Sequence, residues 1–387
     1  MKTVLFNGHD IVLLVICYTC FFFALATLFN GRKSDSTHIY LGFFLLSQVA
    51  ISANTLALYG EVFHAWSVEN IPSIFAILEL SLWLEGPLLL LYVRSALYQR
   101  LQIRKYDALL YFPLFTYLLT IMLVNINYSA ESGSNFLLFL NYDHIQYYEH
   151  LRNITRTSFG FWALLTIQAY QKKLSQAYAN PESVNYSWLK ILVIGFIILR
   201  LWSESYLLVF TLVSEFLPRP ILDLIDFNIL GILENYGQLL LVTVLLFFGL
   251  SDPRNILRVS RAILESLTKK DKVVTYTSEQ VERVDNYMRK MRPYLDNQLK
   301  IDDLAQQVSM PPKLLSNLIN NEFNVNFFEY INAYRLKEII SYLTNPEMDN
   351  QSIIELAFLA GYNSKSSFNR LFKLETGKTP SQFRKER

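Results

Sequence analysis

Five side chains of the kinds that contact nucleic acid gather near the end of the sequence. They are spaced so that one face of a helix would carry them all: Lys365, Ser366, Asn369, Arg370 and Lys373. Lys and Arg reach phosphates from a helix in the major groove, and Asn, Ser, Lys and Arg also read base edges. Any amphipathic helix has a polar face, so this stretch alone leaves DNA contact and simple solvation equally open.

A second copy of the pattern lies about 52 residues upstream. The alignment pairs Ala305 with Ala357, Ser309 with Gly361, and Asn324 with Gly377. Each copy predicts a helix, a tight turn and a second helix, with a small residue where the two helices cross. Gly361, Gly377 and Asn324 are suited to backbone positions with φ > 0. The polar face of the first copy carries Lys313, Ser316, Asn317 and Asn320.

Each second helix also has an apolar face that predicts its buried side. These faces comprise Leu315, Leu318 and Ile319 in the first copy, and Phe368, Leu371 and Phe372 in the second. A helix of about 19 residues, 326–344, joins the copies and would span roughly 28 Å. That length is close to the ~34 Å between successive major grooves on one side of DNA. The repeat therefore favours two DNA-reading units over two solvated faces.

Residues 285–387 resemble the DNA-binding domain of the AraC/XylS family of transcription regulators. The matching residues are Leu356-Ala357, Gly361-Tyr362, Ser366, Phe368, Arg370, Phe372-Lys373, Gly377, Thr379-Pro380 and Phe383-Arg384. The resemblance implies two helix-turn-helix units with base-reading positions at Lys313, Ser316, Asn317, Lys365, Ser366 and Asn369. The first copy differs by Pro311-Pro312 at the start of its recognition helix and by having few cations. The family's usual soluble effector domain is replaced by apolar sequence.

The first 250 residues have the composition of a membrane protein. The chain is 52% hydrophobic and 15% aromatic, and its mean hydropathy is positive. Seven apolar segments are long enough to cross a bilayer as helices. They lie near 10–29, 38–58, 72–98, 107–126, 151–171, 188–213 and 221–249. The predicted fold is thus all-α: a seven-helix transmembrane bundle followed by a double helix-turn-helix domain.

The basic residues between these segments predict the orientation. Odd-numbered loops carry Lys and Arg, namely Arg32, Lys33, Arg100, Arg104, Lys105, Lys172 and Lys173, whereas the second and fourth loops carry none and the sixth has only Arg219. Loops rich in Lys and Arg stay in the cytoplasm. The N-terminus is therefore expected outside, and the C-terminal domain in the cytoplasm.

Ionisable residues inside the spans predict either a ligand or switch site or structural pairing. They include Glu79, Glu85, Arg156, Arg200, Glu204 and Glu234. Such groups are costly in lipid and usually face the bundle interior with partners. Arg200 and Glu204 are four residues apart and could pair with each other. Asp223 and Asp226 fall in the same class.

Other reactive residue types are sparse. Cys17 and Cys20 are interpreted as packing residues in the first span. His144, Glu149 and His150 in the fourth loop favour an acidic surface loop over a metal site. The chain shows no paired catalytic carboxylates, metal-ligand cluster, phosphate loop or hydrolase motif. We therefore expect no enzyme activity, no catalytic residue, no metal and no cofactor.

The segment between the two halves predicts a helix that begins with a capping box, Thr277 with Gln280. Its apolar stripe comprises Val281, Val284, Met288 and Met291. Fewer than three heptads leave two interpretations open, a dimer seam or a face that docks on the following domain.

The sequence predicts three parts: a transmembrane sensor domain (1–250), a juxtamembrane linker (251–284) and a DNA-binding domain (285–387). The expected protein is a multi-pass one-component transcription regulator of the bacterial cytoplasmic membrane. Expected partners are promoter DNA, the lipid bilayer, a second copy in a homodimer, RNA polymerase if the protein activates, and an unknown small-molecule or membrane signal. A seven-helix transporter, or a membrane signalling protein whose tail binds protein, are the alternatives.

Overall fold

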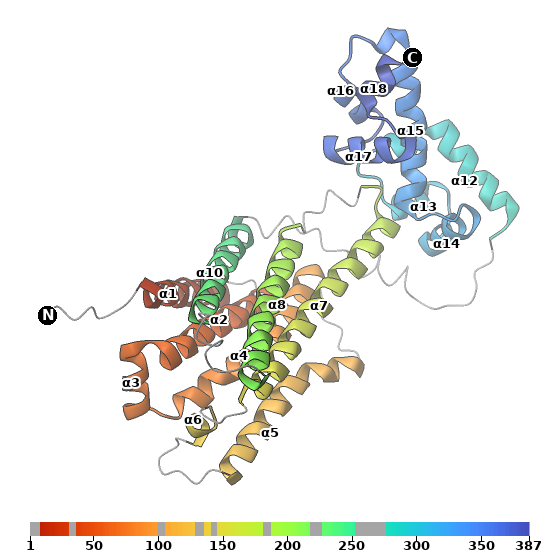
Figure 1. The fold of residues 1–387 in the computed structure, drawn as a ribbon. Coiled ribbons are helices and arrows are strands. Elements are labelled where there is room, and N and C mark those ends of the chain that lie inside the picture. Colours follow the sequence, from red (N-terminus) through yellow and green to blue (C-terminus); the bar gives the residue numbers. More distant parts are fainter. Residues whose placement is uncertain are drawn as a thin grey trace. The chain divides into compact units, whose positions relative to one another are not determined.

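The structure is a computed structural model that describes residues 8–30, 36–98, 105–127, 135–140, 145–180, 187–216, 227–251 and 276–386. Within these ranges all regular elements are helices, which confirms the all-α prediction (Figure 1). The chain forms two compact units. The first comprises Met1–Ile167 and Tyr186–Ile256, and the second comprises Gln168–Asn185 and Leu257–Arg387.

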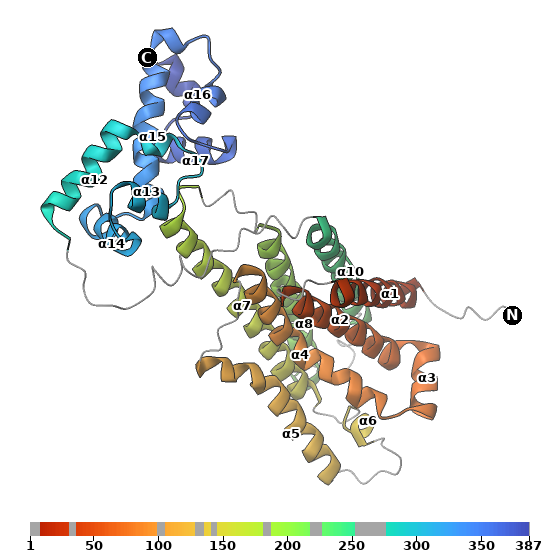
Figure 2. The same cartoon turned by 180° about the vertical axis from the view of Figure 1, so that it is seen from behind.

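The first unit is built from long apolar helices and a few short ones. In order they are α1 (Gly8–Asn30), α2 (Thr37–Tyr59), α3 (Glu61–Asn70), α4 (Ile74–Leu97), η1 (Lys105–Tyr111), α5 (Phe112–Asn127), α6 (Asn135–Leu140), α7 (Ile145–Ala177), α8 (Ser187–Phe216) and α10 (Phe227–Ser251). Helix α2 packs against both α1 and α4, and α10 packs against α1 and α8 (Figure 2). Helix α7 passes from the first unit into the second at residue 168.

Six helices of the described chain are long and apolar enough to cross a membrane. They lie at Gly8–Phe29, Thr37–Tyr59, Ile74–Leu97, Asp107–Ile126, Trp188–Phe216 and Ile229–Phe247. The fifth predicted span, 151–171, lies inside α7, which is not in this set. Helix α7 is more polar along its length, with Arg152 and Arg156 among its polar residues. The seven-span prediction is thus supported for six helices, and the crossing by α7 stays a prediction.

Glycines allow α7 to approach its neighbours closely. A Cβ on Gly86 of α4 would lie 2.8 Å from Cβ of Phe159 in α7. A Cβ on Gly160 of α7 would lie 3.0 Å from a side-chain carbon of Ile197 in α8. Small residues at such crossings are the usual way in which membrane helices pack. Helix α7 therefore lies between α4 and α8 and is held by both.

The second unit contains short helices around one long one. They are α12 (Ser278–Met291), η4 (Pro293–Leu295), α13 (Ile301–Gln307), α14 (Pro312–Glu322), α15 (Phe327–Thr344), η5 (Pro346–Met348), α16 (Ile353–Leu359), α17 (Lys365–Thr376) and α18 (Pro380–Lys385). Capping boxes begin α12, α15, α16 and α18. The box predicted at Thr277 and Gln280 is confirmed. Each box satisfies backbone donors that a helix start leaves unpaired.

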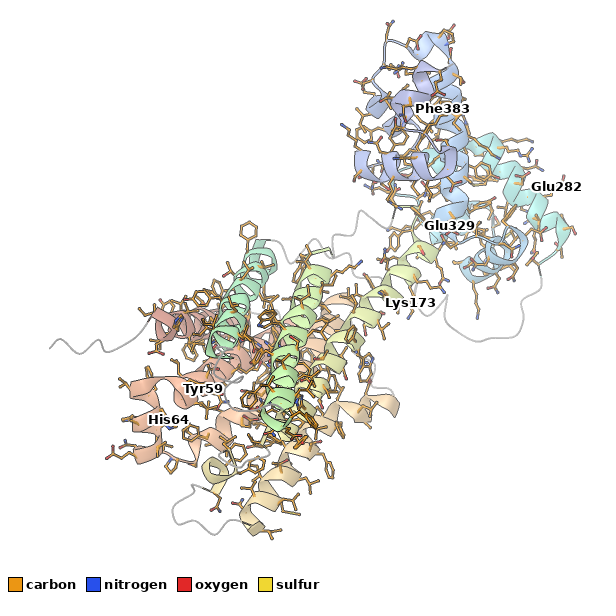
Figure 3. The ribbon with its side chains drawn as sticks, viewed as in Figure 1. Tyr59, His64, Lys173, Glu282, Glu329 and Phe383 are labelled. Atoms are coloured by element: carbon orange, nitrogen blue, oxygen red, sulfur yellow. The ribbon has the colours of Figure 1, made fainter. Side chains whose placement is uncertain are left out.

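Helix α15 contributes to the packing of both halves of this unit. Leu315, Leu318 and Ile319 of α14 are fully buried on one side. On the other side, Ile339 of α15 packs in a cluster with Phe368 and Phe372 of α17, among others. Phe383 of α18, labelled in Figure 3, packs against this cluster. The centre of its ring lies 5.4 Å from that of Phe372. The apolar faces predicted for both second helices thus face the core, with Leu371 partly buried.

Helix α12 belongs to the same unit. Val284 and Met288 are 0% exposed, Val281 is partly buried, and Met291 is 65% exposed. Its Asp285 accepts a hydrogen bond from the Tyr334 hydroxyl of α15 at 2.9 Å. The two central residues of the stripe therefore pack on the domain, as the second interpretation expected.

Some residues named above lie outside the described part of the chain. They are the loop residues Arg32, Lys33, Arg100, Arg104 and Arg219, the acidic residues Asp223 and Asp226, His144, and the linker segment 252–275.

Candidate functional sites: nucleic-acid interface and buried polar network

The two repeated units have the same turn. In the first, the Met310 amide donates to the carbonyl of Ala305 at 2.8 Å, and in the second the Tyr362 amide donates to the carbonyl of Ala357 at 3.0 Å. The residue before each donor has positive φ, 53° at Ser309 and 90° at Gly361. Asn324 (53°) and Gly377 (74°) also have positive φ, as predicted. Each unit is therefore a helix-turn-helix with one geometry.

Helix α17 presents the predicted polar and basic face to solvent. Its exposed residues include Lys365, Ser366, Asn369, Arg370 and Lys373. The opposite face is anchored in the core by Phe368 and Phe372. The hydroxyl of Ser364 caps the helix by accepting from the Ser367 amide, and it lies 2.8 Å from the hydroxyl of Ser366. A rigid helix thus carries three cations and two neutral hydrogen-bonding groups, which suits major-groove contact.

Helix α14 presents a weaker version of that face. Lys313 and Asn317 are partly exposed, but Ser316 is only 8% exposed. The Asn320 amide donates to the Ser316 hydroxyl at 3.4 Å. Pro311 and Pro312 do not disturb the helix, because Pro312 occupies its first position. Of the three readers that the resemblance implies here, Lys313 and Asn317 are the accessible ones.

The linking helix sets the spacing of the two units. Helix α15 has 18 residues, with Asn326 as its N-cap, close to the 19-residue prediction. At 1.5 Å per residue it is about 27 Å long. Two helix-turn-helix units joined by one helix of this length define the class of protein: the fold is that of an AraC-type DNA-binding domain.

Comparisons with known proteins support this assignment of the C-terminal part. Residues 304–386 match the profile of a helix-turn-helix domain family, and the C-terminal part of this chain is a domain of that kind. The AraC/XylS resemblance is thereby confirmed for this part, together with its DNA-binding class. No solved structure matches the chain significantly.

Curated relatives match a minor part of this chain. The Msm operon regulatory protein of Streptococcus mutans is 32% identical over 88 residues, which is 23% of this chain and 31% of that protein. The melibiose operon regulatory protein of Escherichia coli K12 is 28% identical over 90 residues, 23% of this chain and 29% of that protein. An uncharacterised HTH-type transcriptional regulator of Bacillus subtilis, YtdP, is 26% identical over 118 residues, 30% of this chain and 15% of that protein. The match thus spans less than a third of these relatives.

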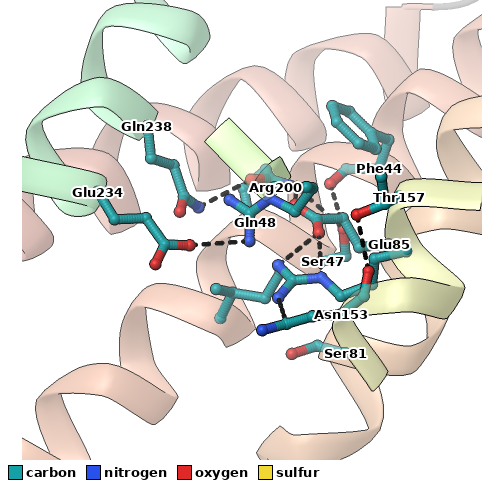
Figure 4. Close-up of polar contacts among 12 residues, drawn as sticks. Phe44, Ser47, Gln48, Ser81, Glu85, Asn153, Thr157, Arg200, Glu234 and Gln238 are labelled. Carbon is teal, nitrogen blue, oxygen red and sulfur yellow. Dashed lines mark hydrogen bonds and ion pairs between the residues drawn. The ribbon is translucent and has the colours of Figure 1, made fainter. Parts of the chain in front are cut away.

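A buried polar network joins four helices of the first unit (Figure 4). Arg156 of α7 pairs with Glu85 of α4 at 2.6 Å. Gln48 of α2 donates to Glu85 at 3.1 Å and accepts from Gln238 of α10 at 2.8 Å. All four side chains are buried. Such paired groups are the form in which ionisable residues persist inside membrane bundles.

Further polar contacts involve α8. Arg200 of α8 contacts Glu234 of α10 at 3.0 Å, and Glu204 contacts His150 of α7 at 2.7 Å. Arg200 and Glu204 therefore each have a partner on another helix, although their spacing had made a mutual pair possible. His150 also contacts the Thr211 hydroxyl at 3.0 Å. This histidine faces α8, which differs from the surface-loop position expected for it.

Glu79, a predicted site residue, has its partner on α7 in Arg152, which the sequence reasoning did not name as a site residue. Arg152 contacts Glu79 of α4 at 2.5 Å, and the Tyr148 hydroxyl donates to the same carboxylate at 3.2 Å. Trp83 in turn donates to Tyr148 at 2.8 Å. Arg152 lies four residues before Arg156, so the two arginines share one face of a predicted helix. That spacing was the signal that could have placed Arg152 beside Arg156 as a site residue.

Proposed function

We propose that this protein is a transcription regulator held in a membrane, with a helical sensor unit and an AraC-type DNA-binding domain in one chain. The observation that carries the DNA-binding part is the exposed face of α17, with Lys365, Asn369 and Lys373 on a helix anchored by its apolar side. The regulators to which the domain is similar support the same assignment.

Membrane insertion is supported by the direction in which apolar side chains point. Many large apolar residues of the six apolar helices are exposed, including Phe21, Ile77, Leu118, Ile198 and Leu240. In water such a surface would drive aggregation, whereas in a bilayer it faces lipid.

We further propose that α7 is the seventh crossing. Its two arginines are the chief obstacle, and both are paired with carboxylates of α4, at Glu79 and Glu85. Paired charges inside a bundle cost far less than charges facing lipid. Seven crossings would put the two ends on opposite sides of the membrane. The Lys and Arg residues of the odd-numbered loops then favour an outside N-terminus and a cytoplasmic DNA-binding domain.

Mapping of the DNA that the intact chain binds across the genome tests the DNA-binding part. We expect discrete enriched sites for the wild-type chain and their loss for a variant with Lys365→Ala and Asn369→Ala. A chain that enriches no site, or a variant with the wild-type pattern, would contradict the assignment.

Reporter fusions test the topology. A reporter that works only in the cytoplasm should be active after Arg387 and inactive when inserted between residues 128 and 134. Activity at both positions would mean an even number of crossings between them and would remove α7 from the set.

The sensing role is proposed for the buried network around Glu85 and Arg200. It contains two arginine–carboxylate pairs and two glutamines from different helices. A ligand or a helix displacement that exchanges one partner for another would change how α7 is held. The signal is therefore expected to act on the contacts of α7 with α4 and α8.

A further inference from the structure

Three residues that follow α7 are part of the DNA-binding unit. Tyr178, Ala179 and Asn180 are buried, and we call them the docking segment. Tyr178 forms an isolated antiparallel bridge with Lys300, and the Ala179 amide donates to the carbonyl of Leu299 at 3.1 Å. The segment thus pairs with the strand-like residues that lead directly into α13, the first helix of the first helix-turn-helix.

The docking segment supplies acceptors to a buried cation. Arg335 of α15 is 0% exposed. Its Nε donates to the carbonyl of Tyr294 at 2.7 Å, and its Nη2 to that of Asp296 at 2.8 Å. Its Nη1 donates to Oδ1 of Asn180 at 2.8 Å and to the carbonyl of Ala179 at 3.3 Å.

Arg335 needs those acceptors because it is a buried cation. Burial lowers the pKa of Arg335 to about 10, so the side chain is still a cation at neutral pH. These four acceptors are uncharged oxygens, and a buried cation that loses acceptors is strongly destabilising. Both acceptors of Nη1 come from the docking segment, so the centre of the DNA-binding unit is complete only when the segment is in place.

The same segment reaches the second helix-turn-helix. The Asn180 side chain donates to the carbonyl of Asn297 at 2.6 Å and to that of Gly361 at 3.4 Å. Gly361 forms the turn that leads to α17, and a Cβ at this position would lie 2.4 Å from the carbonyl oxygen of Tyr294. Asn180 therefore connects the loop before α13 with the turn before α17.

We propose that the docking segment is the connection through which the helical sensor unit controls the DNA-binding unit. When docked, the segment fixes the turn before α17 relative to the first helix-turn-helix, so that both recognition helices are held for binding. When released, it leaves Arg335 short of acceptors and loosens that arrangement. A shift of α7 reaches the segment directly, because the segment follows its last residue, Ala177. This inference rests on the proposed function.

Docking itself is tested by a disulfide in the full chain. Cys17 and Cys20 are first replaced by Ser, and then Tyr178→Cys is combined with Lys300→Cys. Residues paired across an antiparallel bridge lie within the Cα separation that disulfides need. We expect a disulfide within one chain on mild oxidation in membranes. The control pair, Tyr178→Cys with Ser381→Cys on α18, should stay reduced, and equal crosslinking of the two pairs, or none, would overturn docking.

The functional consequence is tested with Asn180→Leu, which removes one acceptor and both donors. Full-length protein in detergent is titrated with the DNA fragment most enriched by the wild-type chain. We expect binding about tenfold weaker or more, and no change for the matched control Gln171→Leu on an exposed position of α7. Wild-type affinity in Asn180→Leu would overturn the inference.

A rescue separates loss of docking from loss of folding. Asn180→Leu is combined with the 178–300 cysteine pair, and affinity is measured before and after oxidation. Recovery on oxidation supports the connection, and continued weakness contradicts it. If the wild-type chain itself enriches no DNA, the proposed function fails, and the crosslinking experiment still decides whether the segment docks.

Discussion

At the scale of single residues, α17 separates base reading from phosphate binding. Asn369→Ala should weaken binding to the specific site by about 1–3 kcal/mol, because it removes contacts to base edges. Lys373→Ala should weaken specific and random DNA alike and lower the salt slope by about one unit, since a Lys on phosphate releases one counterion. Titrations of both DNAs at several salt concentrations measure these effects.

Lys337→Ala is the matched control for Lys373→Ala. Lys337 is an exposed lysine on α15, with its ammonium 5.8 Å from the ring centre of Tyr334, outside the recognition helices. Its removal should leave the salt slope nearly unchanged. Asn317→Ala on α14 should cost less than Asn369→Ala because α14 carries only one cation, Lys313. Identical losses on specific and random DNA for Asn369→Ala would contradict its role as a reader.

Substitutions of the two glycines with positive φ should lower the stability of the C-terminal unit by different amounts. A Cβ added at Gly377 would meet no atom of the described residues within 4 Å, so Gly377→Ala should cost about 1–2 kcal/mol from backbone strain alone. Gly361→Ala adds a clash with the carbonyl of Tyr294 and with Nε of Arg335, at 2.4 and 2.9 Å. Gly361→Ala should therefore lower the free energy of unfolding clearly more than Gly377→Ala. Protease resistance of the C-terminal unit in denaturant ranks the two, and an equal loss would show that the turn can relax.

Sequence reasoning found the residues whose type is set by local backbone geometry and missed contacts between distant segments. Gly361, Gly377 and Asn324 were predictable because only certain residues tolerate positive φ. The burial of Ser316 was not, because helical spacing cannot tell a residue at the edge of the polar face from one at its centre. Asn180 carried no signal at all, since its partners lie more than a hundred residues away in the sequence.

At the scale of elements, α12 is part of the DNA-binding unit. Met288→Ala should destabilise this unit by about 2–5 kcal/mol, because a fully buried methionine leaves a cavity. Met291→Ala on the same helix is the control, and its exposed side chain should make the change nearly neutral. Urea unfolding of the full chain, followed by proteolysis of the C-terminal unit, measures both.

The opposite result would restore the other interpretation of α12. If Met288→Ala leaves the unit stable but lowers crosslinking between copies, the stripe acts between protomers. The sequence could not choose between these outcomes, because a stripe shorter than three heptads is compatible with either partner. The helix itself was predictable, since its capping box and apolar period are local features.

At the scale of the whole molecule, variants of the ion pairs in the first unit should affect protein stability and transcriptional regulation differently. Arg200→Leu alone should cost about 3–5 kcal/mol, because it leaves Glu234 without this cationic partner inside the bundle, although the Tyr206 hydroxyl still donates to it at 2.9 Å. Arg200→Leu with Glu234→Leu should restore insertion and stability, because the double variant removes both charges of the pair and leaves neither one unpaired in the bundle. If the network senses the signal, the double variant should hold transcription in one fixed state.

Membrane yield, thermal stability in detergent and transcription from an enriched promoter are the three measurements. A matched double variant, Thr55→Leu with Thr243→Leu, changes polar residues whose hydroxyls bond within their own helices. It should leave regulation unchanged. Normal signal-dependent transcription in the double Arg200 and Glu234 variant would mean that these charges are structural only.

The long separation between Asn180 and Gly361 has a consequence for the order of events during synthesis. These residues are 181 positions apart, so a ribosome that adds about 5–20 residues per second needs about 10–35 s to connect them. In that interval α8 and α10 must be made before Asn297, Arg335 and Gly361, which Asn180 contacts. The centre around Arg335 therefore closes late, after the last apolar helices have left the ribosome. A DNA-binding unit completed in this order becomes competent only in chains whose apolar helices have already been made.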